Sequence, residues 1–222
     1  MDTFLCTNFF EPRIIGGLGG YLSLAFLLFT GRPEPRLLLD LCLPLCLRGG
    51  VTSLLLGKLF GALLGMMRVH GKAILAEVVV PTLCRAELSA GQLEALQRLL
   101  KEAPADGLGT ALGAYLAADG GVPASWSDAQ ASVLQTLLAR KPALDERTLA
   151  DLVLHIDANG HAGAKSLKFA NLLNTVVRGY AQQLRPHVAI LQRVADTLET
   201  FMKKGILAAL GKLAAVPTDR ES

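Results

Sequence analysis

The side chains most able to bind a metal or to act as a nucleophile are few and scattered. The histidines of the chain are His70, His155, His161 and His187. None of them belongs to an HExxH pattern or stands beside a cysteine at a zinc-ligand spacing. Cys42 and Cys46 are four residues apart with no further ligand nearby, and core packing explains them better than metal binding. We predict no metal site and no cofactor.

Glycine-rich stretches imitate ligand-binding loops but lack the essential spacing. HIDANGHAG (155–163) resembles a calcium loop, yet counted from Asp157 its glycine falls at position four and Lys168 stands at position twelve. We predict an Asn-Gly turn between two helices instead. GLGTALG (107–113) follows no strand, and two near-matches to a phosphate loop have the wrong spacing and no Ser or Thr after the lysine. The residues offer no catalytic constellation, so we predict a protein that is not an enzyme.

The elements that surround these residues are expected to be helices. The chain is 51% hydrophobic and only 5% aromatic, and its apolar residues are mostly Leu and Ala, which favour helices. The best strand candidate, EVVVPTL (77–83), contains Pro81. A net charge of +3 is too small and too evenly spread to indicate nucleic-acid binding. We therefore predict an all-α protein that makes no direct contact with nucleic acid.

Short breakers divide the chain into Leu-rich stretches of helical length. Several breakers end in helix-start signals: a capping box at Ser89–Gln92, N-caps at Ser125 or Ser127 and at Asp145, and an acidic box at Asp196–Glu199. Short links favour antiparallel hairpins, and no fixed repeat period is visible. We predict an irregular right-handed α-solenoid of antiparallel helical hairpins, of the HEAT/ARM type. Its expected parts are an N-terminal segment (1–20), an interaction domain (21–213) and a polar tail (214–222).

Residues 14–31 carry no charge and reach the length at which a membrane span is considered. Four glycines lie at the N-terminal end of the run, so we predict a helix only over Tyr21–Thr30, which would be about 15 Å long. That is half the hydrocarbon thickness of a bilayer. We interpret the run as a buried or interface helix and expect no membrane contact. A small membrane-associated helical protein anchored by residues 14–31 is the alternative.

The stretch LETFMKKGILAALGKL (198–213) predicts a terminal amphipathic helix. Its buried stripe is expected to consist of Leu198, Met202, Ile206, Ala209, Leu210 and Leu213. Phe201 falls about 120° from the centre of this stripe, beside Lys204, Gly205, Ala208 and Lys212. This position indicates an exposed apolar contact with a basic surround. Packing of Phe201 on the preceding helix, with the lysines merely solvated, is the other interpretation.

The order of elements over residues 133–213 resembles the C-terminal domain of the Fanconi anaemia group E family. The shared pattern is VLQxLL, an acid-capped helix, a glycine-rich turn, a Ser-x-x-aromatic-Ala-x-Leu helix (Ser166 to Leu172) and Thr-Phe-apolar-basic-basic…Ala-Ala-Leu-x-Lys-Leu (Thr200 to Leu213). A weaker match reaches back through VVVPTL (78–83) and SLLLGKLFGALL (53–64) to about residue 21. The order and spacing of the motifs carry the resemblance.

The resemblance implies a non-catalytic adaptor of the nuclear Fanconi core complex, a ubiquitin ligase in the DNA damage response to interstrand crosslinks. The family's helical-repeat domain binds the group C protein, sits with other core-complex subunits, and presents the group D2 substrate. A phenylalanine of the terminal helix contributes to the D2 contact, and Phe201 matches it. Met202, Lys203 and Lys204 match the following residues in type. The expected partner-binding residues are Phe201, Met202, Lys203, Lys204, Ala208 and Lys212.

Overall fold

The computed structural model of the chain describes residues 64–67, 69–118 and 125–215. The chain divides into two compact units, Met1–Thr52 and Ser53–Ser222, and every described residue belongs to the second. The predicted N-terminal segment, the uncharged run 14–31 and Cys6, Cys42 and Cys46 lie outside the described residues, as do residues 216–222 of the predicted tail. Within the described ranges, no helix combines the length and apolarity that a membrane span requires.

The described part of the chain is mostly helical and contains no strand, which confirms the all-α prediction for those residues. A helical stretch at 69–74 leads directly into the first named element. The elements are η2 (a π-helix, Leu75–Val79), α4 (Val80–Leu83), α5 (Ala90–Glu102), α6 (Ala105–Leu116), α7 (Asp128–Ala139), α8 (Glu146–Gly160), α9 (Leu167–Gly179), η3 (a 3₁₀-helix, Arg185–His187), α10 (Val188–Thr197) and α11 (Lys203–Ala215).

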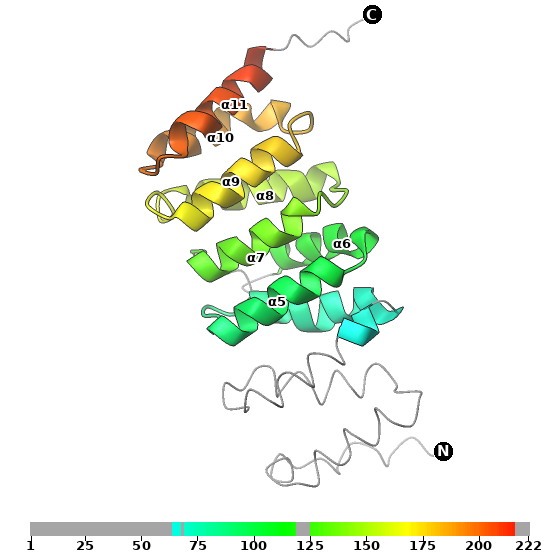
Figure 1. Cartoon of the computed structure of the whole chain (residues 1–222). Coiled ribbons are helices and arrows are strands. Elements are labelled where there is room, and N and C mark those ends of the chain that lie inside the picture. Colours follow the sequence, from blue (N-terminus) through cyan, green and yellow to red (C-terminus); the bar gives the residue numbers. More distant parts are fainter. Residues whose placement is uncertain (1–63, 68, 119–124, 216–222) are drawn as a thin grey trace, which may run out of the picture. The chain divides into compact units, whose positions relative to one another are not determined.

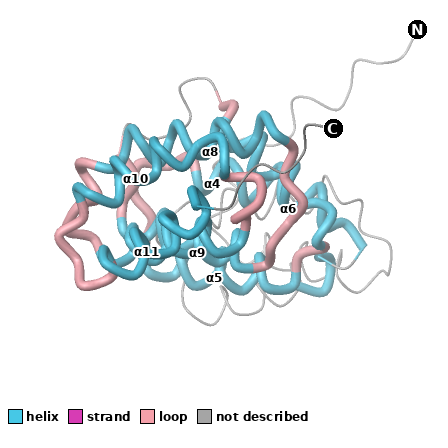
Figure 2. The backbone as a smooth tube through the Cα atoms, turned by 90° about the horizontal axis from the view of Figure 1, so that it is seen from above, coloured by secondary structure: helices cyan, strands magenta, loops and turns pink. Residues whose placement is uncertain are grey.

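The helices form two layers, because each helix packs beside the helix two places along the chain. In one layer α5 contacts α7, α7 contacts α9, and α9 contacts α11. In the other layer η2 and α4 contact α6, α6 contacts α8, and α8 contacts α10 (Figures 1 and 2). Figure 2 shows α8 and α10 on one side and α5, α9 and α11 on the other. Consecutive helices therefore alternate between the layers.

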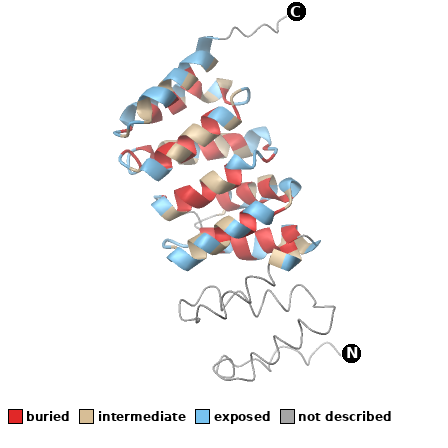
Figure 3. Cartoon of the chain, viewed as in Figure 1, coloured by how far each residue is buried: buried red, intermediate tan, exposed pale blue. Residues whose placement is uncertain are grey.

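Buried residues, most of them apolar, occur along each α-helix from α4 to α11 (Figure 3). Fully or almost fully buried examples from successive helices are Leu99, Leu112, Leu134, Val153, Leu172 and Leu191. Each such side chain contributes on the order of 1.5–3 kcal/mol by leaving water. The buried face is widest in the middle of the described part and narrows at α11, where only Ile206 and Leu210 are buried.

The segment that was the best strand candidate is helical instead. EVVVPTL spans the end of η2 and all of α4, and Pro81 lies in the first turn of α4. The helical stretch runs on from η2 without a break, so Pro81 supplies no amide hydrogen to the turn before it. The wider π-turn just before it accommodates the ring, which would otherwise meet the carbonyl group one turn earlier. Burial of Val78 and Val79 favours the helix despite their β-branched side chains.

Most of the predicted helix starts are confirmed. Complete capping boxes open α5 at Ser89–Gln92 and α7 at Ser127–Gln130, and the Asp145 carboxylate accepts the Thr148 amide at 2.6 Å. This bond holds the pKa of Asp145 below its usual range. The Ser166 hydroxyl caps α9 by accepting the Phe169 amide at 3.0 Å.

The predicted Asn-Gly turn is wrong. Asn159 and Gly160 do not form a turn; they end α8, and the turn begins at His161. The reason is that the Asn159 side chain is buried and bonded to two backbone groups. Its Oδ1 accepts the Trp126 amide at 2.6 Å, and its Nδ2 donates to the His155 carbonyl at 2.8 Å. Residues 214 and 215 of the predicted tail belong to α11, which continues to Ala215.

A second buried amide joins neighbouring helices. Gln130 is fully buried, and its Nε2 donates to the carbonyls of Leu83 and Arg85, at 3.3 and 2.8 Å. The same side chain completes the capping box of α7, since its Oε1 accepts the Ser127 amide at 2.8 Å. One amide therefore satisfies the start of α7 and the chain that follows α4.

Side chains that follow the C-terminal ends of α7 and α9 donate hydrogen bonds to backbone carbonyls of earlier segments. Arg140, which follows α7, donates to the carbonyls of Leu100 and Ala103 at the end of α5, at 3.0 and 3.3 Å. The Tyr180 hydroxyl, which follows α9, donates to the Pro142 carbonyl at 3.1 Å. Burial raises the pKa of Tyr180 to about 12. The Arg140 bonds satisfy carbonyl groups that the end of α5 leaves without a partner, whereas Pro142 lies in the link between α7 and α8.

Candidate protein-interaction site

The predicted terminal helix is divided in two by a turn. Leu198 is the extended C-cap of α10, and α11 begins at Lys203. The expectation of one helix over 198–213 is therefore wrong at its start, and so is the acidic capping box, since Asp196 belongs to the last turn of α10. The physical reason is that α10 and α11 pack against each other, so the chain must reverse direction between them.

Phe201 lies in this turn with its ring in solvent. Its side chain is 83% exposed, the largest exposure among the large apolar residues that the structure describes. This value contradicts the interpretation that the ring packs on the preceding helix. Leu198 on one side and Ile206 on the other are both buried, so the turn is anchored on the core at both ends. The exposed ring therefore lies in a turn whose two ends are held by buried residues.

The remaining predicted site residues fall into two groups. Lys204, Ala208 and Lys212 are exposed on one face of α11, at spacings of four residues. Met202 and Lys203 are partly covered, and the Lys203 ammonium donates to the Asp196 carbonyl at 2.5 Å. Lys203 thus has a role at the end of α10. Of the expected buried stripe, Leu198, Ile206 and Leu210 are buried, whereas Met202, Ala209 and Leu213 are half-buried.

The turn is also joined to the turn that precedes α9. The Glu199 amide donates to the Ala164 carbonyl at 2.9 Å, and the Glu199 carboxylate lies 3.8 Å from the Lys165 ammonium. That ion pair is exposed and contributes little to stability. The backbone bond joins the turn before α11 to the turn before α9, and the two helices contact each other. The first residue of α9 is Leu167, which is 43% exposed.

Sequence reasoning missed Leu167, although a signal was present. The buried face of α9 runs through Phe169, Leu173 and Val176. On a helical wheel Leu167 falls about 140° from the centre of that face. An apolar residue so far outside the buried stripe of its helix is a sign of exposure.

Two of the described side chains that could bind a metal or act as a nucleophile, His155 and Cys84, are partly buried. His155 stacks on Trp126 with ring centroids 6.1 Å apart, and its Nε2 lies 3.3 Å from the Leu116 carbonyl. Cys84 is a free, half-buried thiol whose pKa is raised by burial, which opposes the reactive thiolate. Burial also raises the pKa of Tyr115, in part offset by the nearby Trp126 side chain. No cluster of metal-ligating side chains occurs among residues 64–67, 69–118 and 125–215.

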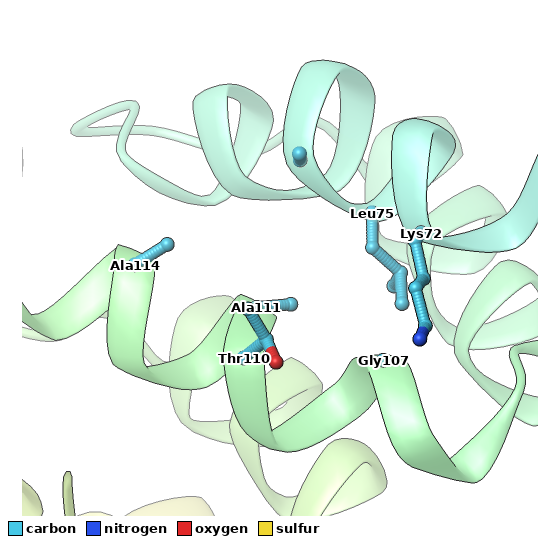
Figure 4. Close-up of a pocket in the computed structure, with 7 residues that line it drawn as sticks. Lys72, Leu75, Gly107, Thr110, Ala111 and Ala114 are labelled. Carbon is cyan, nitrogen blue, oxygen red and sulfur yellow. The ribbon is translucent and has the colours of Figure 1, made fainter.

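The glycine-rich stretch 107–113 is part of α6 and provides room for close packing. A Cβ atom on Gly109 would lie 2.3 Å from the Ala143 carbonyl oxygen, and one on Gly107 would lie 2.9 Å from Leu75 Cδ1. A shallow hollow of about 80 Å³ remains between α6 and the helical stretch that includes η2 (Figure 4). It is lined by Lys72, Leu75, Ala76, Gly107, Thr110, Ala111 and Ala114. A volume of a few water molecules is too small for a nucleotide.

No known family model matches the chain, and no curated protein matches it in sequence.

Proposed function

We propose that this chain is a non-catalytic adaptor whose helices form an irregular right-handed α-solenoid of the HEAT/ARM type. The support for the solenoid is the packing order, in which each helix contacts the helices two places before and after it in its own layer. Solenoids of this kind present extended surfaces to partner proteins. An adaptor needs a surface at which an apolar group is available, and the observation that carries the proposal is the exposed ring of Phe201.

The specific assignment rests on the sequence resemblance over residues 133–213. On this basis the chain acts in the nuclear Fanconi core ubiquitin-ligase complex, in repair of DNA interstrand crosslinks. It bridges the group C protein and the group D2 substrate, beside other core-complex subunits. The exposure of Phe201 supports the assignment, since the matching phenylalanine of the family contributes to the D2 contact and a contact residue has to be accessible.

The D2 contact is expected to centre on Phe201 and to include Lys204, Ala208 and Lys212. An exposed aromatic side chain that becomes buried on binding is a typical hot spot. The three α11 residues add two positive charges and a small side chain on one exposed face of the helix that follows. Lys203 is expected to act on the turn through its bond to the Asp196 carbonyl, rather than by direct contact.

Binding measurements with purified group C and group D2 proteins test the proposal. Phe201→Ala is expected to weaken D2 binding by at least about tenfold and to leave group C binding unchanged. Leu154→Ala is the matched control, because Leu154 is also an exposed apolar residue, 59% exposed, on α8 of the other layer. Unchanged D2 binding by Phe201→Ala removes the assigned site. A wild-type chain that binds neither protein overturns the proposal.

A further inference from the structure

The start of α9, which is a neighbour of α11, also carries an exposed apolar residue. Leu167 is the first residue of α9 and is 43% exposed, and Lys204 is the second residue of α11 and is also exposed. The two helices contact each other in one layer. The bond between Glu199 and Ala164 holds the starts of the two helices together. Figure 1 shows α9 and α11 as neighbours in one layer.

This corner of the molecule, residues 161–168 and 196–212, is basic. It carries five lysines against two acidic side chains. Glu199 lies next to Lys165, and Asp196 offers its backbone carbonyl to Lys203, whereas Lys168, Lys204 and Lys212 are exposed. Asp128 also lies nearby, hydrogen-bonded to the Ser166 hydroxyl. The balance stays positive when this third acid is included.

The surface of α8 is acidic, in contrast to this basic corner. Residues 145–157 carry four acidic side chains and one basic side chain, Arg147, which lies 3.9 Å from Asp151. Arg193 of α10 pairs with Asp157 at 2.7 Å, and the balance stays negative when this second basic group is included. Leu154 is exposed among them. A partner segment with negative charge is therefore attracted to the start of α9 and α11 and repelled from α8.

We propose that Leu167 and Lys168 form a second half of the interaction site and that the site binds an acidic protein segment with apolar side chains. Phe201 and Leu167 provide two apolar contacts, and Lys168 and Lys204 provide charges around them. The inference rests on the proposed function in one respect: the acidic segment belongs to the group D2 protein. Beyond that function, it assigns residues of α9 to the contact and a charge to the bound segment.

The test measures D2 binding by variants of the full chain at about 50 and 300 mM salt. Leu167→Gln and Lys168→Glu are each expected to weaken binding about three- to tenfold at low salt, with the larger loss for the charge reversal. Arg178→Glu, at the other end of α9, and Leu154→Gln, on α8, are matched controls with no expected loss. Circular dichroism is expected to show the same unfolding midpoint for all four variants. Wild-type binding is expected to weaken at high salt, and Lys168→Glu is expected to reduce that dependence.

The outcomes separate the inference from the proposed function. Binding that Phe201→Ala abolishes but that Leu167→Gln and Lys168→Glu leave intact overturns the inference alone. Equal losses from Lys168→Glu and Arg178→Glu also overturn it, because the charge effect is then not local. A wild-type chain that fails to bind the D2 protein overturns both. Selective losses from the two α9 variants, with the controls intact, support it.

Discussion

At the start of α7, amide side chains are buried inside the protein, whereas at the start of α11 an aromatic ring lies in solvent. Gln130 and Asn159 are 0% and 3% exposed, and Phe201 is 83% exposed. Both regions depart from the rule that apolar groups are inside and polar groups outside. They depart from it in opposite directions, and the difference lies in what each side chain contacts.

The buried amides are bonded to backbone groups that belong to neighbouring segments. Gln130 serves the chain after α4, and Asn159 serves the residues before α7. Such bonds are costly to remove, because a buried polar group would be left without a partner. Phe201 lies mostly in water, and its removal costs the fold little. The first region therefore holds the helices together, and the second is available for a partner.

Gln130→Ala is expected to give the largest effect, a loss of about 2–4 kcal/mol in the free energy of unfolding. The substitution removes both interhelix bonds and half of a capping box. Gln92→Ala is the matched control, since Gln92 holds the same position in the capping box of α5 and is expected to cost about 1 kcal/mol or less. Urea unfolding measures both, and equal losses would contradict the role of the interhelix bonds.

Asn159→Ala is expected to lower the unfolding free energy by about 1–3 kcal/mol, because the buried Trp126 amide loses its acceptor. Asn174→Ala, on α9, is the control. Its side chain is half-exposed and accepts from Arg178 in the same helix, so we expect a change below about 0.5 kcal/mol. Thermal unfolding of the two variants compares a buried amide with an accessible one. The assignment fails if Asn159→Ala unfolds at the wild-type midpoint.

Asp145→Ala tests an exposed polar group that nevertheless has a structural bond, and its effect is expected to be smaller than those of the buried amides. The pKa of Asp145 is lowered in the folded state by the bond from Thr148. The stabilisation is therefore present above the unfolded pKa of about 3.9 and is lost as the pH falls through the folded value. Urea midpoints of wild type and variant should differ at neutral pH, and the difference should shrink as the pH falls below the unfolded pKa of about 3.9. A constant difference would contradict the charge effect.

Phe201→Ala is expected to give the smallest change in stability, within about 0.5 kcal/mol of wild type. The ring is exposed, so it leaves no cavity when removed. Combined with the expected loss of D2 binding, this result would separate an interaction residue from a structural one. A loss above about 1.5 kcal/mol would show that the ring packs in the folded protein.

Local signals in the sequence predicted the helix starts well. The capping residues at Ser89, Ser127 and Asp145 act within three residues of themselves, so their bonds depend on nothing distant. Predictions failed where a neighbouring helix decides. Asn159 was expected in a turn because its type favours turns, yet the Trp126 amide, 33 residues away, retains it inside α8. The apolar periodicity over 198–213 likewise predicted one helix, but a turn interrupts it because α10 and α11 pack against each other.

The sequence by itself determined the helical class and the capping residues. Helix formation and capping follow from contacts within a turn or two, which the order of residues specifies. Only the tertiary structure decided which polar side chains are buried and which apolar ones are exposed. The bonds of Gln130 to the end of α4 and of Glu199 to Ala164 depend on how segments distant in sequence pack against each other. Burial is a property of that packing, so periodicity alone could not specify it.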